Sequence, residues 1–114
     1  MSETIFSKII NRELPADIVY EDDDIIAFRD INPQAPVHVL VVPKTPIATA
    51  NDIEPGQAEL IGNMVLVAQK IAKDSGIADD GYRLVINCNR HGCQVVFHLH
   101  MHLIGGKQLR GLAG

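Results

Sequence analysis

Residues 97–103, Phe-His-Leu-His-Met-His-Leu, alternate strictly between apolar and imidazole side chains. Because successive side chains of a β-strand point to opposite faces, this alternation predicts a strand with two unlike faces. One face carries three histidines, His98, His100 and His102. The other face carries four apolar residues, Phe97, Leu99, Met101 and Leu103. We expect the apolar face to pack against a helix, and the whole strand to span Val95 to Ile104.

Other stretches of the chain predict one long helix, one short helix and four further strands. A helix from about Glu54 to Gly76 is indicated by apolar residues at helical spacing, Ile61, Met64, Val65, Ala68, Ile71 and Ala72. A short helical segment is expected within the first twelve residues, and further strands at residues 17–21, 25–29, 37–42 and 82–87. Strands gathered around one long helix indicate an α+β fold with a mainly antiparallel, five-stranded sheet.

The composition narrows the class of protein. A chain of 114 residues provides core enough for one domain, taken as residues 1–114. With 10 basic and 14 acidic side chains the net charge is −4, which argues against a nucleic-acid partner. No stretch approaches the ~20 apolar residues of a membrane helix, and the first residues do not resemble a secretory signal. Two cysteines, Cys88 and Cys93, are too few for a disulfide scaffold, so we expect a cytoplasmic protein.

Three histidines on one strand face have no evident structural task. Charged together they would repel one another, so near neutral pH the row holds about one proton or none. Neutral imidazoles serve as nucleophiles, bases or metal ligands. Three interpretations therefore stay open: a structural role, a zinc site, and covalent catalysis on phosphorus.

The zinc interpretation is the weaker of the two chemical ones. The Cα atoms of His98 and His102 lie ~13 Å apart in a strand, whereas Zn–N bonds are about 2 Å long. A pair of neighbouring histidines would need further ligands, and Cys88, Cys93 and His91 match no structural zinc spacing. We expect no metal and no other cofactor.

Phosphorus chemistry suits the row better. A neutral imidazole attacks a phosphoryl group to form a phosphohistidine, which water then hydrolyses. Neighbouring imidazoles can bond the phosphate oxygens and protonate the leaving group, which places the middle residue, His100, as the nucleophile. The preceding loop, residues 87–94, is polar and contains a glycine, so its backbone N–H groups can face an anion.

The segment His98 to Ile104 resembles the His-x-His-x-His-x-x signature of the histidine triad superfamily. Further segments resemble its branch of histidine triad nucleotide-binding proteins: Thr4 to Ile10, Phe28 to Pro36, Gly81 to Arg83, and Gly105-Gly106. The resemblance implies the HIT-like fold and a homodimer whose two sheets join into one. It also implies a purine nucleoside phosphoramidase that hydrolyses the P–N bond of adenosine 5′-monophosphoramidate and related substrates, so that AMP or GMP is the bound product.

The same resemblance implies a role for individual residues. His100 attacks the α-phosphorus and forms a nucleotidyl-histidine, His102 serves the leaving group, and His98 supports the phosphate. Asp30 is implied to accept both ribose hydroxyls. Asn87 is implied to face the phosphate together with the backbone of three residues: Cys93, Gln94 and Val95. Six apolar residues are implied to form the slot for the base: Ile5, Phe6, Ile9, Leu14, Phe28 and Ile31.

Several positions depart from the family pattern. Pro46 stands where many members carry a histidine, Cys93 where glycine is usual, and Val95 where a polar side chain often contacts the leaving group. The tail after Gly106 lacks the tryptophan of some relatives. These departures motivate a second hypothesis, a nucleotide-binding regulatory module with weak or no hydrolase activity. His38, in the strand predicted at 37–42, is interpreted as structural.

Overall fold

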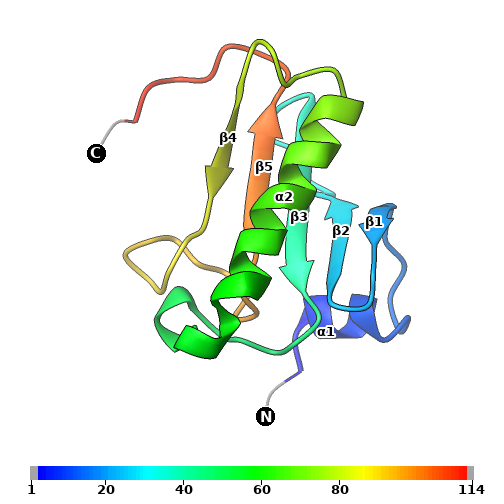
Figure 1. The fold of residues 1–114 in the computed structure, drawn as a ribbon, viewed down its shortest axis with the longest axis vertical. Coiled ribbons are helices and arrows are strands. Elements are labelled where there is room, and N and C mark those ends of the chain that lie inside the picture. The colour runs from blue at the N-terminus through cyan, green and yellow to red at the C-terminus, as the bar shows by residue number, and fades with distance from the viewer. Residues whose placement is uncertain (1–2, 113–114) are drawn as a thin grey trace.

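The computed structural model describes residues 3–112. Its elements are α1 (Ile5–Ile10), β1 (Ile18–Glu21), β2 (Ile25–Arg29), β3 (Val37–Pro43), α2 (Ala58–Asp74), β4 (Tyr82–Val85) and β5 (Met101–Gly105), with short 3₁₀ turns at Ala50–Asp52 and Pro55–Gln57. Figure 1 shows α2 lying diagonally across the front of the sheet. Within the described residues, none of the helices combines the length and the apolar character needed to cross a membrane.

The strands form one sheet in the order β1-β2-β3-β5-β4, and every neighbouring pair is antiparallel. The predicted class is therefore confirmed: an α+β fold with a five-stranded antiparallel sheet, one long helix and one short helix. β3 lies at the centre and pairs with β5, with Leu40 opposite His102. β1 and β4 form the two edges of the sheet.

The face of the sheet beneath α2 carries the larger core. Leu99, Met101 and Leu103 are at most 3% exposed and pack there with the buried residues of α2. Their alternation with the histidines predicts this packing. Phe97 behaves differently: its side chain is 48% exposed, so the prediction that it packs against the long helix is wrong.

The set of buried residues on the long helix α2 differs slightly from the predicted set. Its buried residues are Met64, Val67, Ala68, Ile71 and Ala72. Val65, which the spacing places inside, is 41% exposed, while Val67 is buried although the prediction omits it. Two adjacent apolar ridges run along this helix, and periodicity alone does not say which of them meets the sheet.

Local chemistry sets the two ends of α2. Pro55 opens a 3₁₀ turn, and the regular helix begins at Ala58, a turn later than the sequence predicts. At the other end Gly76 adopts a φ of 75°, and the N–H of Ile77 donates to the carbonyl of Ala72 at 3.1 Å. This left-handed glycine ends the helix where the sequence predicts.

The opposite face of the sheet carries a second, smaller core built around α1. Phe6 and Ile9 of this helix pack with four strand residues, Ile26, Phe28, Leu40 and Val42. A capping box between Thr4 and Ser7 fixes the start of the helix. His102 lies on this face because it alternates with the β5 residues that are buried beneath α2.

Three of the strands differ from their predicted bounds by one or two residues. β1 begins at Ile18, β3 extends to Pro43, and β4 ends at Val85 rather than Asn87. β2 has the predicted bounds, residues 25–29.

The last strand is much shorter than predicted, since β5 begins at Met101 rather than at Val95. Its first ladder pair joins Met101 to β3, and Pro43 has no N–H with which to extend the ladder. Only His102 of the three histidines therefore lies in the strand. The prediction that all three share one face of a single regular strand is wrong.

Replacing Leu103 by Ala tests which face holds the main core. Leu103 is fully buried beneath α2, so Leu103→Ala is expected to lower the free energy of unfolding by about 2–5 kcal/mol in urea titrations. The matched control, Leu112→Ala, alters a side chain that is 98% exposed and is expected to change the free energy by less than about 0.5 kcal/mol. Equal effects of the two substitutions would contradict this assignment.

Candidate active site

The imidazole of His100 is buried and hydrogen-bonded within its own segment. Its Nδ1 atom lies 2.8 Å from the carbonyl oxygen of His98. A carbonyl oxygen only accepts, so Nδ1 carries the proton and donates it. Because a neutral imidazole has a single N–H, the Nε2 atom of His100 keeps a free lone pair. This tautomer is the one that a nitrogen nucleophile needs.

His98 anchors the segment that carries the nucleophile. Its Nε2 atom lies 2.7 Å from the carbonyl oxygen of Pro43 and donates to it. The backbone N–H of Leu99 donates to the carbonyl of Ile47 at 2.6 Å. These two bonds take the place of the strand ladder just before β5. The imidazole of His98 thus bonds to Pro43. The contact of His98 with the nucleophile is made by its backbone carbonyl, which accepts from His100.

His102 has a histidine partner that the sequence analysis missed. Leu40 stands opposite His102 in the β3–β5 ladder, so His38, two residues away on the same face, is a diagonal neighbour. The Nε2 atom of His38 lies 2.9 Å from Nδ1 of His102. The interpretation of His38 as structural overlooks this contact, which depends on strand register and has no signal in the local sequence.

The proton positions of this pair follow from their partners. The backbone N–H of Gln34 donates to His38 Nδ1 at 3.0 Å, so the proton of neutral His38 sits on Nε2. That proton is directed at His102 Nδ1, and neutral His102 then carries its own proton on Nε2. The Oδ2 atom of Asp30 lies 3.4 Å from His38 Nε2 and places a carboxylate beside the pair. His102 thus presents an N–H donor where His100 presents a lone pair.

Burial favours the uncharged form of His98, His100 and His102. Desolvation is the main cause that lowers the pKa of both His98 and His100 below the usual 6.5. Desolvation, followed by the neighbouring His100 and His38, lowers the pKa of His102 to about 4. The ring of Phe6 stands edge-on to His100 with 4.9 Å between centroids and helps to exclude water. These lowered pKa values are in the direction that a largely uncharged triad requires.

One cluster within residues 3–112 has the composition of a metal site: the ligand atoms of Asp30, His38 and His102 lie within 4.8 Å of one another. Its hydrogen bonds oppose a metal. A neutral histidine that binds an ion through Nε2 carries its proton on Nδ1. On His38 that proton would face the N–H of Gln34, donor against donor. The two cysteines do not belong to this cluster.

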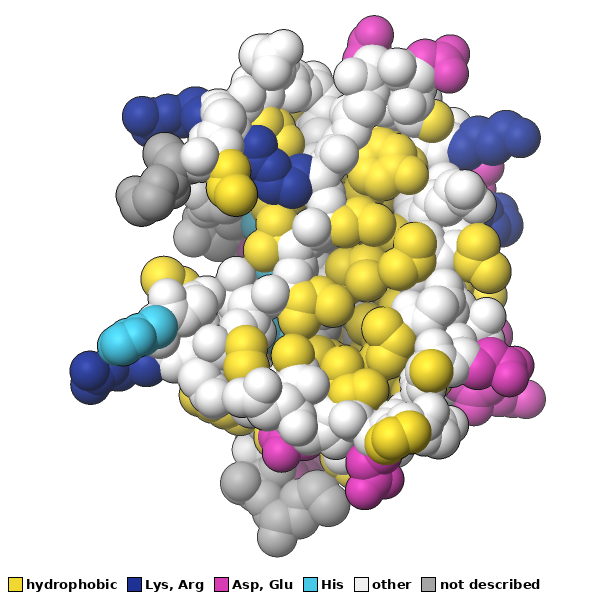
Figure 2. Space-filling view, turned by 60° about the vertical axis from the view of Figure 1, so that its left-hand side comes forward, with side chains coloured by type: hydrophobic (Ala, Val, Ile, Leu, Met, Phe, Trp, Pro, Cys, Tyr) yellow, Lys and Arg dark blue, Asp and Glu magenta, His cyan; other side chains and the backbone are white. Residues whose placement is uncertain are grey.

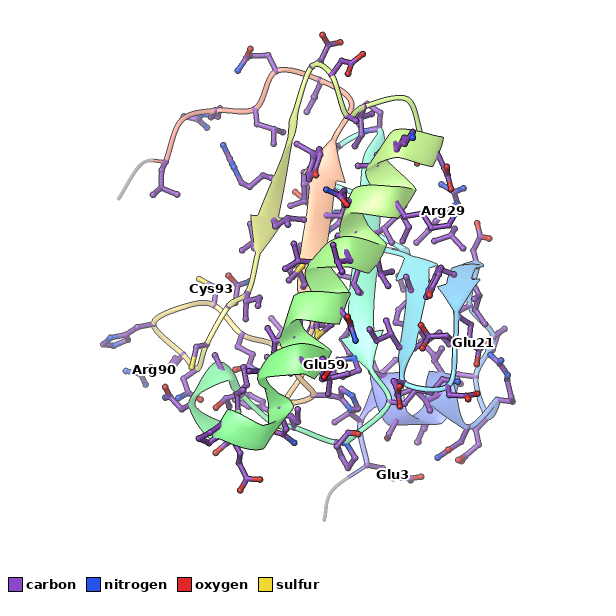
Figure 3. The ribbon with its side chains drawn as sticks, viewed as in Figure 1. Glu3, Glu21, Arg29, Glu59, Arg90 and Cys93 are labelled. Carbon is purple, nitrogen blue, oxygen red and sulfur yellow. The ribbon has the colours of Figure 1, made fainter. Side chains whose placement is uncertain are left out.

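The backbone of the loop before the histidines is constrained at two positions, Gly92 and Cys93. Figure 3 shows Arg90 and Cys93 on the loop that projects beyond β4. Cys93 is exposed and has a φ of 64°, a left-handed conformation that glycine adopts at lower cost. Gly92 cannot carry a side chain without rearrangement, since a Cβ there would lie 2.6 Å from the carbonyl oxygen of Cys88. The side chain of Val95 is 86% exposed and offers no polar group to a bound anion.

The other predicted site residues differ in their exposure. Asp30 directly follows β2, and its Oδ1 accepts from the N–H of Asn32 at 2.8 Å. Asn87 is half-buried just beyond β4, and the side chain of Gln94 is buried. Three of the predicted base-slot residues are buried: Phe6, Ile9 and Phe28. The other three are exposed: Ile5, Leu14 and Ile31.

The chain is similar to several known proteins. A sequence model of the HIT domain matches residues 11–109. The chain is 59% identical over 107 residues to the purine nucleoside phosphoramidase of Escherichia coli strain K12, covering 94% of this chain and 90% of that protein. It is 50% identical over 113 residues to a 14 kDa zinc-binding protein of Zea mays, covering 95% and 85%. A solved HIT family hydrolase from Legionella pneumophila has a TM-score of 0.95 at 47% identity, covering 98% of this chain and 100% of that one.

The low pKa of His102 makes the stability of the fold depend on pH. Between about pH 6.5 and 4, His102 is protonated in the unfolded chain but not in the folded one. The free energy of unfolding therefore falls as the pH falls through this window. His102→Gln removes this contribution, and urea titrations from pH 7 to 4.5 are expected to show a shallower loss. His91→Gln, at an exposed histidine of the loop, is expected to keep the slope of the unaltered chain. Identical slopes for all three proteins would contradict the burial of a neutral His102.

Proposed function

This chain belongs to the HIT domain family, and we propose that it is a purine nucleoside phosphoramidase. Its substrates are adenosine 5′-monophosphoramidate and related purine nucleotides in which nitrogen is bonded to the α-phosphorus. Its products are AMP or GMP and the free amine. The Escherichia coli relative of that name and the solved hydrolase support this proposal.

One observation carries the proposal: the hydrogen bond of 2.8 Å to the His98 carbonyl leaves the Nε2 lone pair of His100 free. The lone pair is available at neutral pH because burial lowers the pKa of this imidazole. His102 lies beside it, with 5.0 Å between ring centroids. A fixed, neutral nucleophile next to an N–H donor suits displacement at phosphorus.

The reaction proceeds in two displacements. In the first, Nε2 of His100 bonds to the α-phosphorus, the P–N bond of the substrate breaks, and the leaving nitrogen departs as an amine after taking up a proton. In the second, a water oxygen bonds to phosphorus, the bond to His100 breaks, and the water gives up a proton. One water is consumed overall, and His100 returns to its neutral form. His102 donates a hydrogen bond from Nε2 to the leaving nitrogen or to a phosphate oxygen.

The nucleotide lies along the α1 face of the sheet in this proposal. The Asp30 carboxylate accepts the two ribose hydroxyls, and the base lies against the buried rings of Phe6 and Phe28, whose centroids are 5.5 Å apart. The exposed side chains of Ile5 and Ile31 close over it from the rim. Asn87 and the main chain of residues 93–95 hold the phosphate.

We propose that the reaction needs neither metal nor cofactor. The support is the hydrogen-bonded state of the Asp30–His38–His102 cluster, in which His38 Nδ1 already accepts from the N–H of Gln34. The whole of residues 1–114 is taken as one HIT domain. Two free cysteines, Cys88 and Cys93, suit the reducing cytoplasm.

We further propose that two chains pair through β4 and α2, so that their sheets join into one. β4 is an edge strand with unpaired main-chain groups. Figure 2 shows a broad apolar area on the side of the molecule that carries β4 and α2. Partly buried and exposed apolar residues of these elements and of the segment after β4 supply it: Leu60, Ile61, Val65, Tyr82, Leu84 and Ile86. The opposite edge differs, because Glu21 of β1 is paired with Arg12 and Lys44.

Removing the nucleophile tests the covalent mechanism. His100→Asn is expected to lower turnover of adenosine 5′-monophosphoramidate by at least about 10³-fold, while AMP still binds because its contacts to Asp30 and the loop remain. Amine release measures turnover, and calorimetry measures binding. Near-native turnover by the variant would contradict the mechanism.

Two further arms of the same assay separate the other hypotheses. Full turnover in EDTA by protein that contains no zinc supports the metal-independent reaction, whereas loss of turnover on metal removal contradicts it. AMP binding without any amine release by the unaltered protein would favour the nucleotide-binding regulatory module instead. His91→Gln, at an exposed loop position, is the control and is expected to keep full turnover.

A charge placed in the apolar area tests the proposed dimer. Val65→Glu alters a side chain that is 41% exposed, so the chain should fold while the interface carries an unpaired carboxylate. Sedimentation velocity is expected to show the mass of two chains for the unaltered protein and of one chain for the variant. Leu112→Glu, at a side chain that is 98% exposed in the tail, is the control and should leave the dimer intact. An unaltered protein that sediments as one chain would contradict the proposal.

A further inference from the structure

Gln94 is a buried polar residue in a loop whose other residues are exposed or half-buried. Its side chain is 7% exposed, whereas Cys93 and Val95 on either side of it are exposed. An amide taken out of water is costly unless its donors and acceptor are all satisfied. The buried amide of Gln94 therefore needs hydrogen-bond partners within the protein, which its exposed neighbours do not need.

All the hydrogen-bonding groups of the Gln94 amide have partners, and these partners join three parts of the chain. Its Oε1 accepts from the N–H of Asn89 at 2.8 Å. Its Nε2 donates to the carbonyl of Ala48 at 2.8 Å and to the carbonyl of Val96 at 3.0 Å. The backbone N–H of Gln94 also donates to the carbonyl of Asn89 at 3.0 Å. One side chain thus ties the start of the loop, its end and the segment after β3 together.

The segment after β3 is also hydrogen-bonded to the segment that carries the catalytic histidines. Ile47, next to Ala48, accepts the N–H of Leu99 at 2.6 Å, and Leu99 stands between His98 and His100. The loop and the segment that carries the nucleophile are therefore hydrogen-bonded to adjacent residues, Ala48 and Ile47. A shift of the loop relative to His100 would have to break the bond between Gln94 and Ala48.

The same loop offers main-chain donors to a ligand. Within the described part of the chain, the backbone N–H groups of Val95 and Val96 donate to no other backbone or side-chain group. These two groups directly follow Gln94. The bond from Gln94 Nε2 to the Val96 carbonyl fixes the peptide unit after them, and the bond from the Gln94 N–H to the Asn89 carbonyl fixes the peptide unit before them. Preorganised N–H groups of this kind stabilise a phosphate whose charge rises during displacement.

We propose that Gln94 is a positioning residue that holds these N–H groups toward the α-phosphate of the nucleotide, acting through the loop without touching the ligand. The inference rests on the proposed function, since it takes the bound group to be a nucleotide phosphate. It adds a role for the Gln94 side chain to the one expected of its backbone: the side chain faces the protein, and only the backbone borders the site.

Two ligands that differ only in the phosphate test this role. Gln94→Met keeps the size and neutrality of the side chain but removes the three hydrogen bonds of its amide. Calorimetry is expected to show AMP binding about tenfold weaker than in the unaltered protein, with adenosine binding changed less than about twofold. The value of kcat for adenosine 5′-monophosphoramidate should fall as well. Gln69→Met, the same change at an exposed position of α2, is the control and should alter none of these quantities.

Each outcome decides between positioning and a general structural role. Equal weakening of AMP and adenosine, or no weakening of either, overturns the proposal. If Gln94→Met does not fold, Gln94→Asn serves, because the shorter amide cannot reach both Asn89 and Ala48, and the same selective loss of AMP is expected. Failure of both variants to fold assigns Gln94 to the fold alone and also overturns it. If the unaltered protein binds AMP no better than adenosine, the phosphate site itself is refuted, and with it both proposals. If the unaltered protein binds AMP selectively but shows no turnover, only the proposed hydrolase activity is refuted.

Discussion

The site depends on one hydrogen bond, from Nδ1–H of His100 to the carbonyl oxygen of His98. Imidazole exchanges its two neutral tautomers readily in water, and only one of them has a lone pair on Nε2. A buried carbonyl oxygen 2.8 Å from Nδ1 selects that tautomer. Because both groups belong to the same short segment, everything that fixes the segment also fixes the nucleophile. The bonds from His98 to Pro43 and from Leu99 to Ile47 have this effect.

The two faces of the sheet have different roles. Beneath α2 it buries Leu99, Met101 and Leu103 and thereby supplies most of the apolar core. The α1 face carries the smaller core, and there Phe6 packs against His100. Low solvent access on this face depresses the pKa values of the histidines and keeps them neutral. The same burial that stabilises the fold near neutral pH therefore supplies the chemical state that catalysis needs.

Much of this arrangement can be predicted from the sequence, since alternation along residues 98–103 separates core residues from histidines. The period of α2 and the stop at Gly76 are local features as well. What the sequence misses depends on distant partners. The end of the ladder at Met101 follows from pairing with β3, and the contact between His38 and His102 follows from register. The inward turn of Gln94 depends on the Ala48 carbonyl, 46 residues away in the chain.

The central claim concerns proton positions, and two-bond proton–nitrogen NMR correlations of the histidine rings measure them directly. For the protein at pH 7, the account predicts neutral rings with the proton on Nδ1 of His100 and on Nε2 of His102. Binding of AMP should perturb the bare Nε2 of His100 most. A protonated Nε2 on His100, or a charged imidazolium at this pH, would contradict the account, because the nucleophile would have no lone pair to offer.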